Sequence, residues 1–253
     1  MERACICAIG VMAKAPMAGR SKTRQCPPLW PAQAAALSAA FLRDVTENIA
    51  LAARQAPIQG FAAYAPAGSD ALLRDHLAAG TGLLLADGSP DMPHGVQGFG
   101  RCLLHAMQAM FAAGFGAGIV LNSDSPTLPT SLLATAAFLL LAPGQRVVLG
   151  PADDGGYYLL GATVPYAGLF ADIAWSTDTV AATTRVRAAS LGLQVIELPR
   201  WYDVDDAASL ARLLAELRAT PPPAGLRPHA AFATRAALSR LALLAPDQPR
   251  AIA

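Results

Sequence analysis

Short apolar runs alternate with longer, alanine-rich helical patterns along almost the whole chain. Strand-like runs that are each followed by a helix favour a mostly parallel sheet, because parallel neighbours need a crossover connection. Such sheets are covered by helices on both faces. The alternation therefore predicts an α/β fold in three layers, an α/β/α sandwich around a mixed, mainly parallel sheet.

Cap and turn residues place the elements along the chain. Pro31 suits the first turn of a helix that reaches about Ala53. Asp206 is expected to cap the helix that ends near Arg218. The expected strands are 4–12, 58–64, 83–85, 117–121, 146–149, 157–161 and 194–198. The other expected helices begin near Ser69 or Asp70, after the loop 86–97, at 130, after 176–178 and at 230.

The length of 253 residues suits one large domain with a small appendage. We assign residues 1–218 to the α/β domain, 219–229 to a proline-rich linker, and 230–253 to a C-terminal helix and tail. The helix is expected to pack back on the domain. Self-association into a homo-oligomer is the alternative.

Composition excludes several classes of partner. A formal charge of +1 and a charged fraction of 15% argue against bulk nucleic acid or an acidic membrane surface. The apolar stretches are too short to span a bilayer, and the amino end lacks a secretory signal. The cysteines at 5, 7, 26 and 102 lack zinc-site spacing, so we interpret them as small core residues in a reducing compartment. We expect a cytoplasmic protein.

Both lysines of the chain, Lys14 and Lys22, lie in one loop after the first predicted strand. Arg20 and Arg24 share this cationic loop (residues 13–24), and Gly19 would let backbone N–H groups approach a ligand. Open α/β sheets bind phosphate-bearing ligands at the carboxyl ends of their strands. The loop matches no Walker A pattern, but we interpret it as a nucleotide-phosphate clamp. An ordinary solvated loop is the alternative.

Three aspartates follow other predicted strands. Asp124 comes just after the strand 117–121, so its carboxylate should project at the carboxyl edge, although capping of the next helix is the alternative. Asp203 and Asp205 are one residue apart, which puts both on the same side of an extended segment. Carboxylates suit Mg2+ or Mn2+. A metal-bound phosphate would pair with both the carboxylates and the cationic loop.

An acidic, glycine-rich turn is predicted between two strands. Gly155 and Gly156 allow the backbone to pass close to a ligand. Asp153 or Asp154 could act as a base or bind sugar hydroxyls, and we favour Asp154. Tyr157 follows at the exit of the turn as a candidate substrate contact. A plain hairpin turn is the alternative.

Residues 175–177 read Trp-Ser-Thr. Trp175 could stack on a ring of the substrate. Ser176 and Thr177 could contact the substrate, but capping of the following helix is the role that we expect for their hydroxyls.

Five motifs occur in order along the chain. They are Ala-Lys-Ala-Pro-x-x-Gly-Arg-x-Lys-Thr-Arg at 13–24, Ser-Asp-Ser-Pro-x-Leu at 123–128, Gly-Pro-Ala-x-Asp-Gly-Gly-Tyr-Tyr-Leu-Leu-Gly at 150–161, Trp-Ser-Thr at 175–177 and Asp-Val-Asp at 203–205. Together they resemble a bacterial family of proposed glycosyltransferases, single-domain GT-A-like proteins of the nucleotide-diphospho-sugar transferase superfamily. Some members are assigned to arsenosugar biosynthesis. The chain more distantly resembles 2-phospholactate guanylyltransferases.

The resemblance implies roles for the matching residues. In the guanylyltransferases an Asp-x-Pro aspartate and an Asp-x-Asp pair hold metal, which implies that the three aspartates bind metal here. The matching loop implies nucleotide-phosphate contacts for Lys14, Lys22 and Arg24. The chain departs from the family pattern at Gln25, where Leu is usual, and at Gly98 and Cys102, where Asp and Arg are expected.

These observations predict a glycosyltransferase that uses a nucleotide-sugar donor, Mg2+ or Mn2+, and a small-molecule acceptor. The alternative is a nucleotidyltransferase that holds a nucleoside triphosphate and releases pyrophosphate. The departures at Gly98 and Cys102 leave a third reading, a nucleotide-binding protein without catalytic activity.

Overall fold

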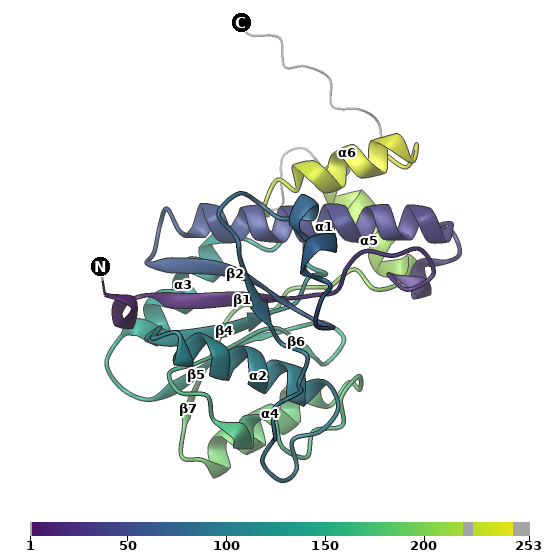
Figure 1. Cartoon of the computed structure of the whole chain (residues 1–253). Coiled ribbons are helices and arrows are strands. Elements are labelled where there is room, and N and C mark those ends of the chain that lie inside the picture. Colours follow the sequence, from purple (N-terminus) through teal and green to yellow (C-terminus); the bar gives the residue numbers. More distant parts are fainter. Residues whose placement is uncertain (1, 220–224, 245–253) are drawn as a thin grey trace, which may run out of the picture.

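The structure is a computed structural model that describes residues 2–219 and 225–244. The strands in these residues are β1 (Cys7–Ala13), β2 (Ile58–Tyr64), β3 (Gly82–Leu85), β4 (Ala117–Leu121), β5 (Arg146–Pro151), β6 (Tyr157–Ala162) and β7 (Gln194–Glu197). They form one sheet in the order β3-β2-β1-β4-β6-β5-β7 (Figure 1). β6 is antiparallel to both neighbours and the other neighbouring pairs are parallel. The mixed, mainly parallel sheet is confirmed.

Helices cover both faces of this sheet (Figure 1). They are α1 (Pro31–Ala52), α2 (Phe99–Ala112), α3 (Thr130–Leu141), α4 (Val180–Ser190), α5 (Ala207–Arg218) and α6 (Phe232–Arg240). In β1, Ile9 belongs to the core under α1 and α3, whereas Ala8 belongs to the core under α2 and α4. Successive side chains of a strand point to opposite faces, so each strand serves two cores. The predicted three layers are confirmed.

Two helix starts follow the sequence signals. α1 begins at Pro31, and the Trp30 N–H ahead of it donates to Gln33 Oε1 at 2.8 Å. α5 is capped by Asp206, whose Oδ1 accepts from the Ser209 N–H at 2.8 Å. In both cases a side chain satisfies a backbone group that the helix itself leaves unpaired.

Two local predictions are wrong. The segment after Ser69 forms two short 3-10 turns, Asp70–Leu72 and Arg74–His76, instead of an α-helix. The Ser69 hydroxyl donates to the Pro66 carbonyl, so it caps nothing. At the amino end, residues 3–5 form another 3-10 turn, which leaves Cys5 exposed while Cys7 is buried in β1.

The C-terminal helix packs against the domain through α1. Asp44, fully buried on α1, accepts hydrogen bonds from the first-turn N–H groups of Ala233 at 2.9 Å and Thr234 at 2.7 Å. Burial raises the pKa of this carboxyl, and these hydrogen bonds oppose the shift. The helix is shorter than the sequence predicts, and the prolines of the expected linker lie outside the described residues, as does the tail from 245. The domain boundaries therefore stay a prediction.

Asp44→Ala is expected to lower the free energy of unfolding by about 1–3 kcal/mol, because a buried and a partly buried N–H group of α6 lose their acceptor. Urea denaturation followed by circular dichroism measures the effect. Glu47→Ala is the matched control, since in the described part of the chain this partly exposed residue of α1 has a single ion pair, at 4.0 Å with Arg43. Equal stabilities of the two variants would contradict the anchoring role of Asp44.

Within residues 2–219 and 225–244, none of the helices combines the length and the hydropathy of a membrane-spanning segment.

Candidate functional site

A pocket of about 580 Å³ lies where β1 and β4 end. These strands are adjacent and parallel, with Val11 paired to Leu121, so the loops that follow them meet at one edge of the sheet. The cationic loop forms one wall, and the first turn of α2 contributes to another. The predicted site residues that line this pocket are Lys14, Arg20, Lys22, Arg24, Asp124 and Asp205.

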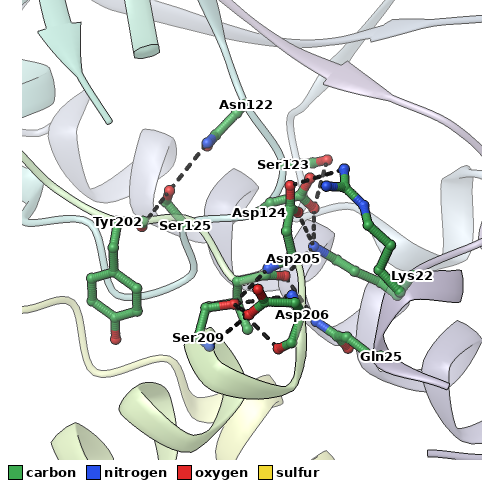
Figure 2. Close-up of polar contacts among 12 residues, drawn as sticks. Lys22, Gln25, Asn122, Ser123, Asp124, Ser125, Tyr202, Asp205, Asp206 and Ser209 are labelled. Carbon is green, nitrogen blue, oxygen red and sulfur yellow. Dashed lines mark hydrogen bonds and ion pairs between the residues drawn. The ribbon is translucent and has the colours of Figure 1, made fainter. Parts of the chain in front are cut away.

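Lys22 lies between the carboxylates of the pocket (Figure 2). Its Nζ is 2.6 Å from Asp124 Oδ1 and 3.3 Å from Asp205 Oδ1, and it donates to the Val204 carbonyl at 2.6 Å. The Lys22 side chain is only 6% exposed. Arg24 is 76% exposed and lies 3.5 Å from Asp205 Oδ2. The buried Lys22 thus contacts both carboxylates, whereas the exposed Arg24 contacts Asp205.

Backbone and side-chain hydrogen bonds hold three distant segments together here. The Val204 N–H donates to the Asp124 carbonyl at 2.8 Å, and the Ser125 hydroxyl donates to the Tyr202 carbonyl at 2.9 Å. The buried Gln25 amide donates to the Val204 carbonyl at 2.8 Å. The cationic loop, the loop after β4 and the loop before α5 therefore form one hydrogen-bonded unit.

Two further residues, which were not predicted from the sequence, also hold the loop after β4 in place. Asn48 of α1 donates to the Leu128 carbonyl at 2.6 Å. The His229 N–H donates to the Thr127 carbonyl at 3.0 Å. An asparagine inside the apolar pattern of a helix was the available signal for Asn48, whereas His229 had none. The alternative role of Asp124 as a helix cap is excluded, because Pro129 precedes α3.

Negative charge accumulates around Asp203. Burial, followed by the charges of Asp205, Asp154 and Asp124, raises the pKa of Asp203 to about 7. The pKa of Asp205 is also raised, by burial and by Asp124, although Lys22 opposes the shift. Aspartates that repel one another in a partly buried site favour the binding of an added cation.

The donor set suits a hard divalent cation, because carboxylate oxygens are the ligands that Mg2+ and Mn2+ prefer. Within the ranges 2–219 and 225–244, however, no three His, Cys, Asp or Glu side chains are gathered in a metal-holding arrangement. The ammonium of Lys22 lies between two of the predicted ligands instead. The chemistry of the residues fits a metal, and the metal site itself stays a prediction.

The acidic turn joins β5 to the antiparallel β6, so the hairpin alternative is correct for its backbone. Gly155 has a φ of 89°, and a Cβ there would lie 2.0 Å from the Asp178 carbonyl oxygen. This close packing, without any ligand, explains the glycine. The Gly156 N–H donates to Asp154 Oδ1 at 2.8 Å. Asp154 is exposed and is near enough to Asp203 to affect its pKa.

A second recess, of about 170 Å³, adjoins the main pocket at Met12, Phe99 and Asp124. Tyr157 and Asn122 also line it. Its walls are partly apolar and partly polar, and the buried Tyr157 hydroxyl has no hydrogen-bond partner in the described part of the chain. Among the predicted substrate contacts, Tyr157 is the one that the structure brings beside Asp124.

The other predicted contacts lie apart from these pockets. Trp175 packs edge-on against Phe99, with ring centroids 5.9 Å apart, and covers Gly100. The predicted capping by Ser176 or Thr177 is wrong, because α4 starts only at Val180. The Thr177 hydroxyl donates to the Ala174 carbonyl instead. Gly19, with a φ of 75°, permits the turn that follows Met17 and does not itself line the pocket.

The departures from the family pattern are part of the site. Gly98 and Cys102 line the main pocket from the start of α2, and Gln25 supports the loop that carries Asp205. At Gly98 and Cys102 small residues stand where the family pattern has charged ones, and at Gln25 a polar residue stands where leucine is usual. The wall opposite the cationic loop is therefore less charged than the resemblance implies.

A model of a protein family described as "Uncharacterized protein conserved in bacteria (DUF2064)" matches residues 48–177, slightly more than half of the chain. No curated protein shows significant sequence similarity. Among solved structures, a proposed nucleotide-diphospho-sugar transferase from Desulfovibrio desulfuricans G20 is 25% identical and has a TM-score of 0.76, with 95% of this chain and 97% of that chain covered. The resemblance to this superfamily and its fold are confirmed.

A CMP:2-keto-3-deoxy-manno-octonic acid synthetase, solved in complex with CTP, is also similar. The TM-score is 0.50 at 13% identity, over 82% of this chain and 96% of that chain. At this identity the likeness shows a shared fold.

Proposed function

This chain belongs to the DUF2064 family of bacterial proteins, and we propose that it is a glycosyltransferase that takes its glycosyl group from a nucleotide-diphospho-sugar. One observation carries the proposal: four cations and two carboxylates from separate segments line a single pocket at the carboxyl edge of the sheet. Similarity over nearly the whole chain to a proposed nucleotide-diphospho-sugar transferase supports the donor class.

The cationic loop would hold the donor diphosphate. Charge builds on the nucleoside diphosphate as the glycosyl bond breaks, and Lys14, Arg20, Lys22 and Arg24 are available to offset it. Positive groups that are already in place cost little reorganisation during the reaction. The same loop therefore serves both binding of the donor and departure of the leaving group.

Asp124, Asp203 and Asp205 would hold the divalent cation. A bound Mg2+ or Mn2+ supplies further neutralisation of the diphosphate. The several carboxylates around Asp203 support this role, because their charges raise the pKa of Asp203, and that of Asp205 is raised even though Lys22 and Arg24 oppose the shift.

The acceptor would enter beside Asp124. The recess next to the main pocket offers apolar side chains and the side chain of Tyr157 to a small acceptor. Asp154 is the candidate for the base that takes the acceptor proton, since it is exposed close to Asp203. Substrate contacts of Gly155, Gly156, Trp175, Ser176 and Thr177 stay predictions from the sequence.

The donor and the type of reaction can be tested in two successive experiments. A thermal-shift panel of nucleotide sugars, nucleoside diphosphates and nucleoside triphosphates, each with and without Mn2+, is expected to reveal a nucleotide sugar that raises the unfolding temperature. Incubation with that donor should then release nucleoside diphosphate. Lys14→Ala should abolish most of the shift, whereas Arg74→Ala, in an exposed ion pair outside the pocket, should leave it unchanged.

Other outcomes identify the alternatives. Pyrophosphate release from a nucleoside triphosphate would mean nucleotidyl transfer. Metal-assisted binding without turnover of any donor would mean a non-catalytic nucleotide-binding protein.

A further inference from the structure

We infer that Lys22 is an internal counter-ion, which occupies the place between Asp124 and Asp205 before substrate binds and which a divalent cation must displace. The inference rests on the proposed function, because it assumes that these aspartates bind metal. It adds a competition between a side chain of the protein and its cofactor.

The contacts of Lys22 are those of a bound cation. Three oxygens surround its Nζ, from Asp124 at 2.6 Å, Val204 at 2.6 Å and Asp205 at 3.3 Å. Its Nζ also lies 5.1 Å from the centre of the Phe41 ring. Almost no water reaches this side chain, which is 6% exposed. The ammonium is therefore held as an ion in a site and not as a solvated surface charge.

A metal ion and this ammonium cannot use the same oxygens together. Mg2+ binds oxygens at about 2.0–2.1 Å, so an ion shared by Asp124 and Asp205 would lie in the space that Nζ fills. Two cations there would also repel each other. Binding of the metal to the Oδ1 atoms that Nζ contacts therefore requires the lysine to leave.

The Lys22 amine can move elsewhere in the main pocket, and binding of a diphosphate would favour that movement. It lines the main pocket together with the other cations of its loop, on the side where a diphosphate would bind. Its backbone is left-handed, with φ 52° and ψ 39°, a conformation that is strained for a non-glycine residue. The amine contacts help to hold this strained turn, and the flexible stem can redirect the amine when they are lost.

Displacement of Lys22 would couple the binding of the metal to the binding of the donor. A diphosphate offers Lys22 new oxygen partners, so it should ease the arrival of the metal, and the metal should in turn strengthen binding of the diphosphate. Linkage makes the two effects equal in free energy. Before the donor binds, Lys22 keeps the aspartates paired and weakens their hold on free metal.

The first test is Mn2+ binding, followed by the electron paramagnetic resonance signal of free Mn2+. Lys22→Met should bind Mn2+ about tenfold or more tightly than the wild type, because the competing ammonium is gone. Arg24→Met removes the same charge from the same loop but an exposed one, so its effect should be far smaller. Asp124→Asn should weaken Mn2+ binding in either background.

The second test needs no variant. Lys14 and Lys22 are the only lysines of the chain, so acylation of each amine can be followed separately by peptide mass spectrometry. Saturating Mn2+ alone should raise the acylation rate of Lys22 several-fold relative to Lys14, because displacement exposes its amine.

The two proposals can fail separately. Unchanged Mn2+ affinity in Lys22→Met, or an unchanged Lys22 acylation rate at saturation, would overturn the counter-ion role, while weaker binding by Asp124→Asn would still support the metal site. If neither the wild type nor Lys22→Met binds Mn2+, the metal assignment itself is wrong and both proposals fall.

Discussion

Asp124→Asn is expected to lower metal-dependent release of nucleoside diphosphate by about 100-fold or more. Loss of one preorganised electrostatic group commonly raises an activation barrier by about 3–4 kcal/mol. The change keeps the size of the side chain but removes a charge that meets both Lys22 and the proposed metal. Initial rates at saturating donor and Mn2+, with the donor found by thermal shift, measure the loss.

The control for this variant is Asp70→Asn. Asp70 is in an ion pair with Arg74 outside the pocket, so neutralising it removes a carboxylate without touching the site. Turnover should stay at the wild-type level. Full metal-dependent activity in Asp124→Asn would mean that this aspartate is not a metal ligand.

Gly155→Ala is expected to lower the free energy of unfolding by about 3 kcal/mol. The new Cβ would meet the Asp178 carbonyl at 2.0 Å, at a backbone φ of 89° that favours glycine. Both the clash and the backbone strain carry costs on the order of 1–3 kcal/mol. Because the obstacle is backbone, the turn and the start of α4 must move apart. Urea denaturation gives the stability, and the far-ultraviolet spectrum shows whether the fold survives.

The neighbouring glycine provides the comparison. In Gly156→Ala the nearest atom to the new Cβ is Asp154 Oδ1 at 3.1 Å, the tip of an exposed side chain that can move. A loss of less than about 1 kcal/mol is expected there. If Gly155→Ala were as stable as Gly156→Ala, close packing would not be the reason for the first glycine.

Much of the site could be predicted because it follows from strand direction. Parallel neighbours end at the same edge of a sheet, so a cationic loop after β1 and an aspartate after β4 had to lie near each other once these strands paired. Asp206 as a cap followed from its place before a helical pattern. Both features are predictable because a helix cap depends on a few neighbouring residues and the meeting of loops depends on the direction of whole strands.

The errors came from places where local pattern and tertiary contact disagree. Ser176 and Thr177 have the chemistry of caps, but the chain runs on to Val180 before α4 starts. Cys5 follows the alternation of a strand, yet a 3-10 turn places it outside the sheet.

The sequence by itself determined the layers, the mainly parallel sheet and the edge at which the charged loops gather, because the periodicity of buried residues and the direction of strands encode them. Only the tertiary structure decided which charges meet. Lys22 and Asp205 are 183 positions apart, and their contact depends on hydrogen bonds through Gln25, Val204 and Ser125. Those bonds form between loops whose conformations no local pattern specifies.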